Sequence, residues 1–166
     1  SRGLGDVYKR QILDDLKDLV KNIPWVIMLT VTILQFTTLA MKGGAYVYYF
    51  ENYVSKNSLS DFISPIIDFL SSIGINFFGS DPVSAGFGLF NAGGIIFMII
   101  GIGLSKMLAD KYGKRNVFGV FLFISTLFIL VFYFLSPDSI NLIFGAQIFH
   151  GFFYGITIPL LSLIHI

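Results

Sequence analysis

Four long apolar segments joined by polar connections dominate the pattern along the chain. About 20 residues of helix, rising about 1.5 Å per residue, cross the roughly 30 Å hydrocarbon layer of a membrane. The segments do not alternate between polar and apolar residues, as strands of a membrane barrel would. The pattern therefore predicts four transmembrane helices, at about residues 24–50, 83–105, 117–135 and 141–160.

Two further segments have one apolar face each. In residues 13–20, leucines and a valine recur at helical spacing among acids and lysines, which predicts an amphipathic helix on the cytoplasmic surface. Residues 61–78, inside the outer loop 51–82, predict a second interfacial helix. Pro65 and Asp68 argue against a fifth crossing there. Its apolar face comprises Phe62, Ile63, Ile66, Phe69, Leu70 and Ile73.

Composition supports an integral membrane protein. The chain is 55% hydrophobic and only 13% charged, which is too few charges for the surface of a soluble domain. The absence of cysteine excludes disulfides and thiolate metal sites. The sequence contains no pattern typical of a metal cluster, an activated nucleophile or a phosphate loop, so we expect no enzyme, no cofactor and no metal.

The distribution of charge predicts the orientation of the four spans. Between the second and third spans lie four basic residues and one acid, whereas the loop 51–82 has a single lysine and four acids. Lysine and arginine collect on the cytoplasmic side of membranes. We therefore expect the first span to start inside, in a multi-pass protein of a bacterial inner membrane.

The two ends of the chain are related through the genetic code. Residues 6–11 can be written GAT GTG TAT AAG AGA CAG, and the reverse complement of that string encodes residues 161–166. The element resembles the transposon end used to prepare sequencing libraries, and residues 1–5 fit the rest of such an adapter. We expect residues 1–11 and 161–166 to be adapter-derived, and 12–160 to be a natural, metagenomic fragment. Without the ends, eight basic and nine acidic residues remain, so nothing points to nucleic acid.

A distinctive motif, Leu-Ala-Asp-Lys-Tyr-Gly-Lys-Arg at residues 108–115, lies in the basic loop. An acid (Asp110), a spaced glycine (Gly113) and paired basic residues (Lys114 and Arg115) resemble the loop signature of the major facilitator superfamily. The glycine permits a tight turn, and the carboxylate could pair with an arginine of another helix as two bundles rock. The alternative is an ordinary positively charged cytoplasmic loop.

The first span carries a second resemblance. A charged lead-in at residues 17–22 and Pro24-Trp25 precede Lys42-Gly43-Gly44-Ala45, and Tyr48-Tyr49-Phe50 follows. This order resembles the seventh transmembrane helix of the glycoside–pentoside–hexuronide:cation symporters. The following spans fit helices eight to ten, although the outer segment 55–82 is longer than the pattern suggests.

The resemblance implies a fragment of a six-helix C-terminal bundle, all-α and embedded in the lipid bilayer. It implies symport of a sugar or glycoside with Na⁺ or H⁺ by alternating access. The N-terminal half and helices eleven and twelve would be the missing partners, and the cation site would lie there. Another facilitator branch, such as a drug–proton antiporter, is the first alternative. A non-transporting membrane scaffold, or the membrane part of an enzyme, is the second.

Side chains that could line a substrate cavity occur in two spans. Lys42 is costly in hydrocarbon and is either functional or extended toward the interface. Tyr46 and Tyr49, three residues apart, share a helix face and could stack on a sugar ring. They could instead belong to an aromatic belt at the membrane surface.

The fourth span carries a polar stripe of Gln147, His150 and Tyr154, which could bind a polyhydroxylated substrate. His150 could also take part in proton coupling. The alternative is that these groups form hydrogen bonds to neighbouring helices. Two pairs of small residues indicate close helix packing: Gly151 with Gly155, and Gly88 with Ala92.

Overall fold

The computed structural model describes residues 15, 17–75 and 81–163. Every regular element in this part is helical, and no strand occurs in it. The helices that follow the N-terminal segment are α2 (Ile23–Asn52), α3 (Lys56–Ser72), α4 (Pro82–Tyr112), α5 (Lys114–Val131) and α6 (Ile140–Leu163). All except α3 are long and apolar enough to cross a membrane. The prediction of an all-α protein with four such helices is confirmed.

The chain forms two compact units, one ending at Lys42 and one beginning at Gly43. In the first unit, residues 17–21 are helical, and the rest of the predicted amphipathic segment lies mostly outside the described residues. The part of α2 in this unit exposes large apolar side chains such as Ile33, Leu34 and Phe36. Its threonine hydroxyls donate to carbonyls four residues earlier, so they present no unsatisfied donor to a lipid.

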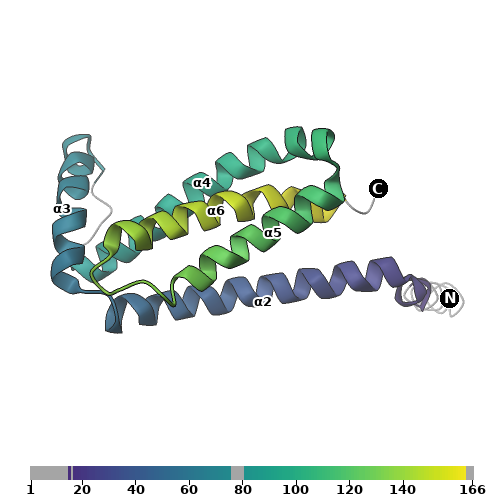
Figure 1. Cartoon of the computed structure of the whole chain (residues 1–166), viewed down its shortest axis with the longest axis horizontal. Coiled ribbons are helices and arrows are strands. Elements are labelled where there is room, and N and C mark those ends of the chain that lie inside the picture. The colour runs from purple at the N-terminus through teal and green to yellow at the C-terminus, as the bar shows by residue number, and fades with distance from the viewer. Residues whose placement is uncertain (1–14, 16, 76–80, 164–166) are drawn as a thin grey trace, which may run out of the picture. The chain divides into compact units, whose positions relative to one another are not determined.

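In the second unit, α6 packs along both α4 and α5, and α3 contacts α4 and α6 (Figure 1). Two apolar cores result. One gathers side chains from the end of α2, from α3, from the start of α4, from the end of α5 and from the start of α6. The other joins the opposite end of α6 to the junction of α4 and α5.

Helix α3 occupies the segment for which a helix was predicted between the first two spans. It begins at Lys56, five residues before the predicted segment, and Pro65 lies inside it. Leu59 and Ile63 face the core, whereas Phe69 and Ile73 are exposed. The Ser55 N–H donates to Pro137 O at 3.1 Å, which ties the start of α3 to the connection between α5 and α6. Residues 76–80 lie outside the described part.

The junction between the second and third predicted spans differs from the prediction. Helix α4 continues beyond residue 105 to Tyr112, and α5 begins at Lys114 rather than near 117. The prediction located the edge of the apolar segment, but lysine, methionine, leucine and alanine continue a helix well beyond that edge. The helix ends only where Gly113 adopts φ +85°.

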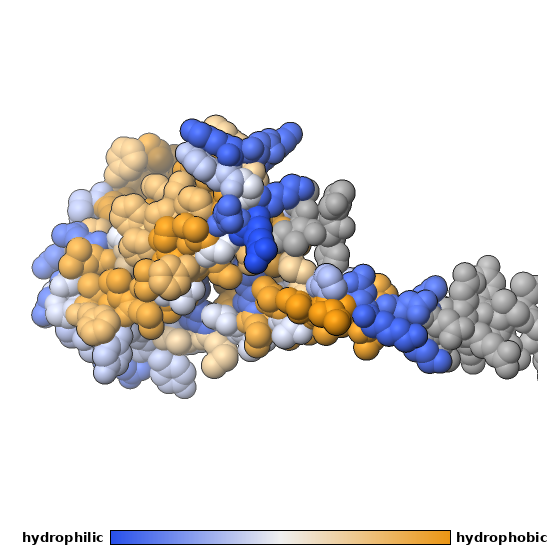
Figure 2. Space-filling view, turned by 45° about the vertical axis from the view of Figure 1, so that its right-hand side comes forward, coloured by the Kyte–Doolittle hydropathy of each residue, from blue (hydrophilic) through white to orange (hydrophobic). Residues whose placement is uncertain are grey.

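Large apolar side chains cover much of the surface of the second unit. Figure 2 shows hydrophobic residues over much of the visible face, with hydrophilic residues toward its margins. A soluble monomer rarely exposes so large an apolar area. These faces suit lipid or further apolar helices. They include Ile95, Ile96, Ile99 and Ile100 of α4 and Val120, Phe123, Leu127 and Leu130 of α5.

Candidate functional site

Buried polar side chains lie along α6, on the faces that contact α4 and α5. Gln147, His150 and Thr157 are 5%, 3% and 0% exposed. Thr157 donates its hydroxyl to Tyr154 O at 2.7 Å, within its own helix. Gln147 and His150 instead reach neighbouring helices. Polar side chains are costly in an apolar bundle unless they are satisfied, so each needs an explanation.

Gln147 lies against the backbone of α4. A Cβ atom added at Gly94 would stand 2.6 Å from Gln147 Nε2, so a larger residue there would require this side chain to shift. The Oε1 atom is fully buried and has no hydrogen-bond donor among the described residues. The amide oxygen is therefore an acceptor enclosed in the bundle and still open to a partner.

His150 connects α6 to α5. Its Nδ1 atom lies 2.9 Å from Ser125 O. Because a carbonyl oxygen can only accept, the proton must be on Nδ1, and in the neutral ring Nε2 is then the acceptor. The ring stacks on Tyr154 with centroids 5.8 Å apart and planes inclined by 20°. The contact to a neighbouring helix is thus present, while contact with a substrate stays a prediction.

The rings of Tyr46 and Tyr49 both contact Phe132, the residue that follows α5. Tyr46 is 6% exposed, its ring centroid lying 4.9 Å from that of Phe90 and 5.2 Å from that of Phe132. Tyr49 is half-buried, 5.9 Å from Phe132, and its hydroxyl has no hydrogen-bond partner among the described residues. Tyr46 is therefore part of the aromatic core and does not belong to a surface belt. Tyr48, at 72% exposed, is better suited to such a belt.

Lys42 is the last residue of the first unit, one helical turn before Tyr46 along the chain. Helix α2 continues through Gly43 and Gly44 without interruption. A Cβ atom added at either glycine would meet nothing within 4 Å. These glycines therefore mark no close contact and no break in the helix.

The predicted gate loop is a turn of one residue. Gly113, at φ +85° and ψ 137°, is the only residue between α4 and α5. Asp110 lies in the last turn of α4, and Lys114 and Arg115 lie in the first turn of α5, contrary to the expected loop. All three side chains are exposed. Gly113 makes the tight turn, the charged groups are accessible to another part of the protein, and a role of this turn in a gate stays a prediction.

Glycines bring the backbones of α4 and α6 into direct contact. A Cβ atom added at Gly151 would collide with Gly94 O, and one at Gly155 would collide with Met98 O. On the other helix, Gly101 faces Phe152 O in the same way. Close packing was predicted for Gly151 and Gly155. Packing was also expected for the glycine-rich stretch 86–94, which includes Gly94. Gly101 was missed, although it lies two helical turns after Gly94, which was a signal.

Gly88 and Ala92, the other predicted pair, are half-buried.

Comparison with known proteins adds no assignment of this site, because no protein-family model, curated protein or solved structure matches the chain.

Proposed function

We propose that the chain is part of a secondary active transporter of the major facilitator type, which carries a sugar or glycoside together with Na⁺ or H⁺. The main support is the buried amide of Gln147, whose Oε1 atom has no donor among the described residues. A transporter for a polyhydroxylated substrate needs acceptors of this kind inside an otherwise apolar bundle.

The energetics of that acceptor favour a ligand with hydroxyl groups. Leaving a buried acceptor unsatisfied costs about 1–3 kcal/mol. A sugar hydroxyl that donated to Gln147 would recover much of this cost on binding. An apolar drug would not, which is why the sugar symporter is preferred to the drug–proton antiporter.

The close contact of α4 and α6 supports a mechanism in which these helices move as one body. Glycines hold their backbones together, and His150 ties α6 to α5. Rocking would then take place against the remainder of the transporter, with Asp110, Lys114 and Arg115 exposed at the end that could form and break contacts.

Uptake by the complete transporter that contains this segment tests the proposal. The protein is reconstituted in liposomes, and labelled galactosides, pentosides and hexuronides are offered with an inward Na⁺ or proton gradient. We expect gradient-dependent uptake of one of them. Substitution Gln147→Ala should raise its KM about fivefold, as the loss of one hydrogen bond would.

The matched control is Thr126→Ala, which removes an exposed α5 hydroxyl that donates to Leu122 O within its own helix. It should leave KM unchanged. Failure of every glycoside to enter, or exchange of a drug for protons in the same liposomes, would refute the sugar assignment.

A further inference from the structure

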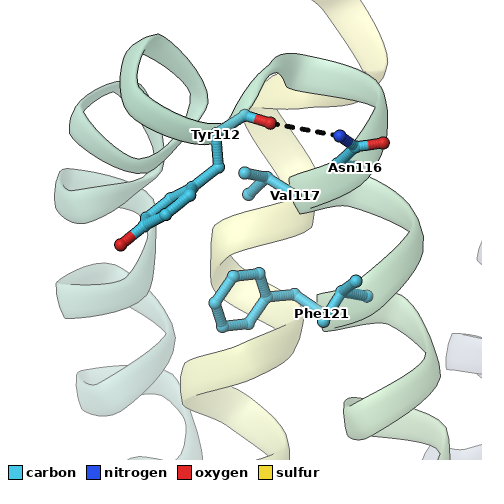
Figure 3. Close-up of a pocket in the computed structure, with 5 residues that line it drawn as sticks. Tyr112, Asn116, Val117 and Phe121 are labelled. Carbon is cyan, nitrogen blue, oxygen red and sulfur yellow. Dashed lines mark hydrogen bonds between the residues drawn. The ribbon is translucent and has the colours of Figure 1, made fainter.

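An open apolar groove lies between the end of α4 and the start of α5. It encloses about 300 Å³ and is lined by Tyr112, Asn116, Val117, Val120 and Phe121. Figure 3 shows Val117 and Phe121 of α5 directed toward the side of the groove where Tyr112 lies, with the ribbon of α6 behind them. Helices α4 and α5 pack mainly on α6 and little on each other. The space between the end of α4 and the start of α5 therefore stays unfilled.

Basic residues flank the lining of this groove along the chain. They are Lys106, Lys111, Lys114 and Arg115, with Asp110 as the one acid among them, and all five are exposed. Helix α5 has no acidic residue in its first turn and no side chain that caps its first N–H groups. An anion at this end would therefore meet basic side chains and the positive end of a helix.

The length of α4 predicts that the apolar lining of the groove lies within reach of lipid chains. Helix α4 has 31 residues, hence a length of about 46 Å, which exceeds the roughly 30 Å hydrocarbon layer. Its basic end, and the start of α5 beside it, should therefore reach the lipid headgroups. Val117 and Phe121 follow Lys114 by about 4 and 11 Å along α5.

We propose that this groove binds one anionic phospholipid. Its phosphate lies at Lys114 and Arg115, and one acyl chain follows Val117, Val120 and Phe121. The charge pattern places the groove on the cytoplasmic side, where anionic lipids attract basic residues. A zwitterionic lipid could place an acyl chain on the same apolar residues. Its headgroup has no net charge, so the basic side chains would attract it only weakly.

Quenching of a single tryptophan tests the proposal on the full chain. The only tryptophan is removed as Trp25→Phe, and Val120→Trp reports on the groove. The protein is placed in phosphatidylcholine nanodiscs that contain brominated phosphatidylglycerol or, at the same fraction, brominated phosphatidylcholine. We expect phosphatidylglycerol to quench about threefold more strongly, and K114Q/R115Q to abolish this preference.

Two controls separate the groove from general attraction to a charged surface. Phe123→Trp places the reporter on another exposed position of α5 and should show no preference. K17Q/K21Q removes the same charge elsewhere and should leave the preference at Val120→Trp intact. Equal quenching by both lipids, or an equal loss in K17Q/K21Q, would overturn the proposal.

Mass spectrometry of the unsubstituted chain gives an independent measurement, in case the tryptophan disturbs the groove. Released from mixed nanodiscs, the chain should retain one phosphatidylglycerol, and K114Q/R115Q should retain about fivefold less. Retention of phosphatidylcholine in equal amount, or of neither lipid, would count against the site.

Discussion

Gly151 and Gly155 let the α6 backbone touch that of α4. Their Cα atoms lie where any larger residue would collide with Gly94 O or Met98 O. Two packed backbones cannot relax as a flexible side chain can, so the space is closed to even one methyl group. Lipid gives little hydrophobic drive for helices to associate, and close approach of this kind then provides much of the attraction.

Substitution Gly155→Ala should destabilise the α4–α6 pair by about 1–3 kcal/mol, because the helices must separate. Thermal unfolding of the chain in dodecyl maltoside, followed by size-exclusion chromatography, measures the effect. Gly145→Ala in the same helix is the control, since a Cβ atom there meets nothing within 4 Å. It should stabilise the chain by up to about 1 kcal/mol, and equal losses in both variants would contradict the packing argument.

Asp81 caps the start of α4. Its Oδ2 atom accepts from the Ser84 hydroxyl at 2.7 Å and from the Ser84 N–H at 2.9 Å. These two hydrogen bonds lower the pKa of the carboxyl below its ordinary value of 3.8. Pro82 follows in the first helical position, where its missing N–H does no harm.

The cap should weaken in acid. Since the pKa of Asp81 is lower in the folded chain, the stabilisation is complete above the ordinary value of 3.8 and is lost as the pH falls through the lower, folded value. Hydrogen exchange at the Ser84 and Ala85 amides, corrected for its intrinsic pH dependence, should therefore accelerate below about pH 4. In Asp81→Asn, the corrected exchange rate should not change with pH. The same acceleration below about pH 4 in this variant as in the unsubstituted chain would refute this account.

At the scale of elements, the hydrogen bond from His150 to Ser125 O joins α6 to α5, whose contact is otherwise mainly apolar among the described residues. Substitution His150→Leu should cost about 0.6–2 kcal/mol, the range for hydrogen bonds between membrane helices. His150→Asn places an amide near the position of Nδ1 and should recover at least half of the loss. The same unfolding assay measures both, and Thr126→Ala should be neutral. Equal behaviour of His150→Leu and His150→Asn would show that shape alone matters.

The positions of the helices could be predicted because each apolar run is long enough to cross a membrane. Helix α2 was placed within two residues at both ends, since Pro24 and the polar residues after Phe50 bound the run. The end of α4 was missed by seven residues. Hydropathy records where the hydrocarbon ends, and a helix ends only where its backbone conformation changes.

The surroundings of the candidate site could not be predicted to the same extent. Helical spacing showed that Tyr46 and Tyr49 share a face. The rings that this face meets, Phe90 and Phe132, come from other parts of the second unit, and sequence spacing does not identify them. The same is true of His150, for which the sequence left a substrate and a neighbouring helix as equal alternatives. The partner Ser125 is 25 residues away, and its acceptor is a backbone atom that no sequence motif marks.

At the scale of the whole molecule, the lack of cysteine allows a direct test of orientation. Single cysteines introduced as Lys56→Cys and Arg115→Cys both lie at exposed positions. In intact cells, a membrane-impermeant maleimide should label the first, and should label the second only after the cytoplasmic side is opened. The reverse pattern would invert the topology, and labelling of both in intact cells would exclude a crossing by α4.

The turn at Gly113 has a consequence for how the protein enters the membrane. With one residue between them, α4 and α5 form a helical hairpin whose loop closure costs almost no entropy. As synthesis proceeds from the N-terminus, α5 emerges directly after α4. The one-residue connection is too short for α5 to stay far from the membrane while α4 inserts. We therefore expect the two helices to be inserted as one unit, their charged tip remaining on the side of the ribosome.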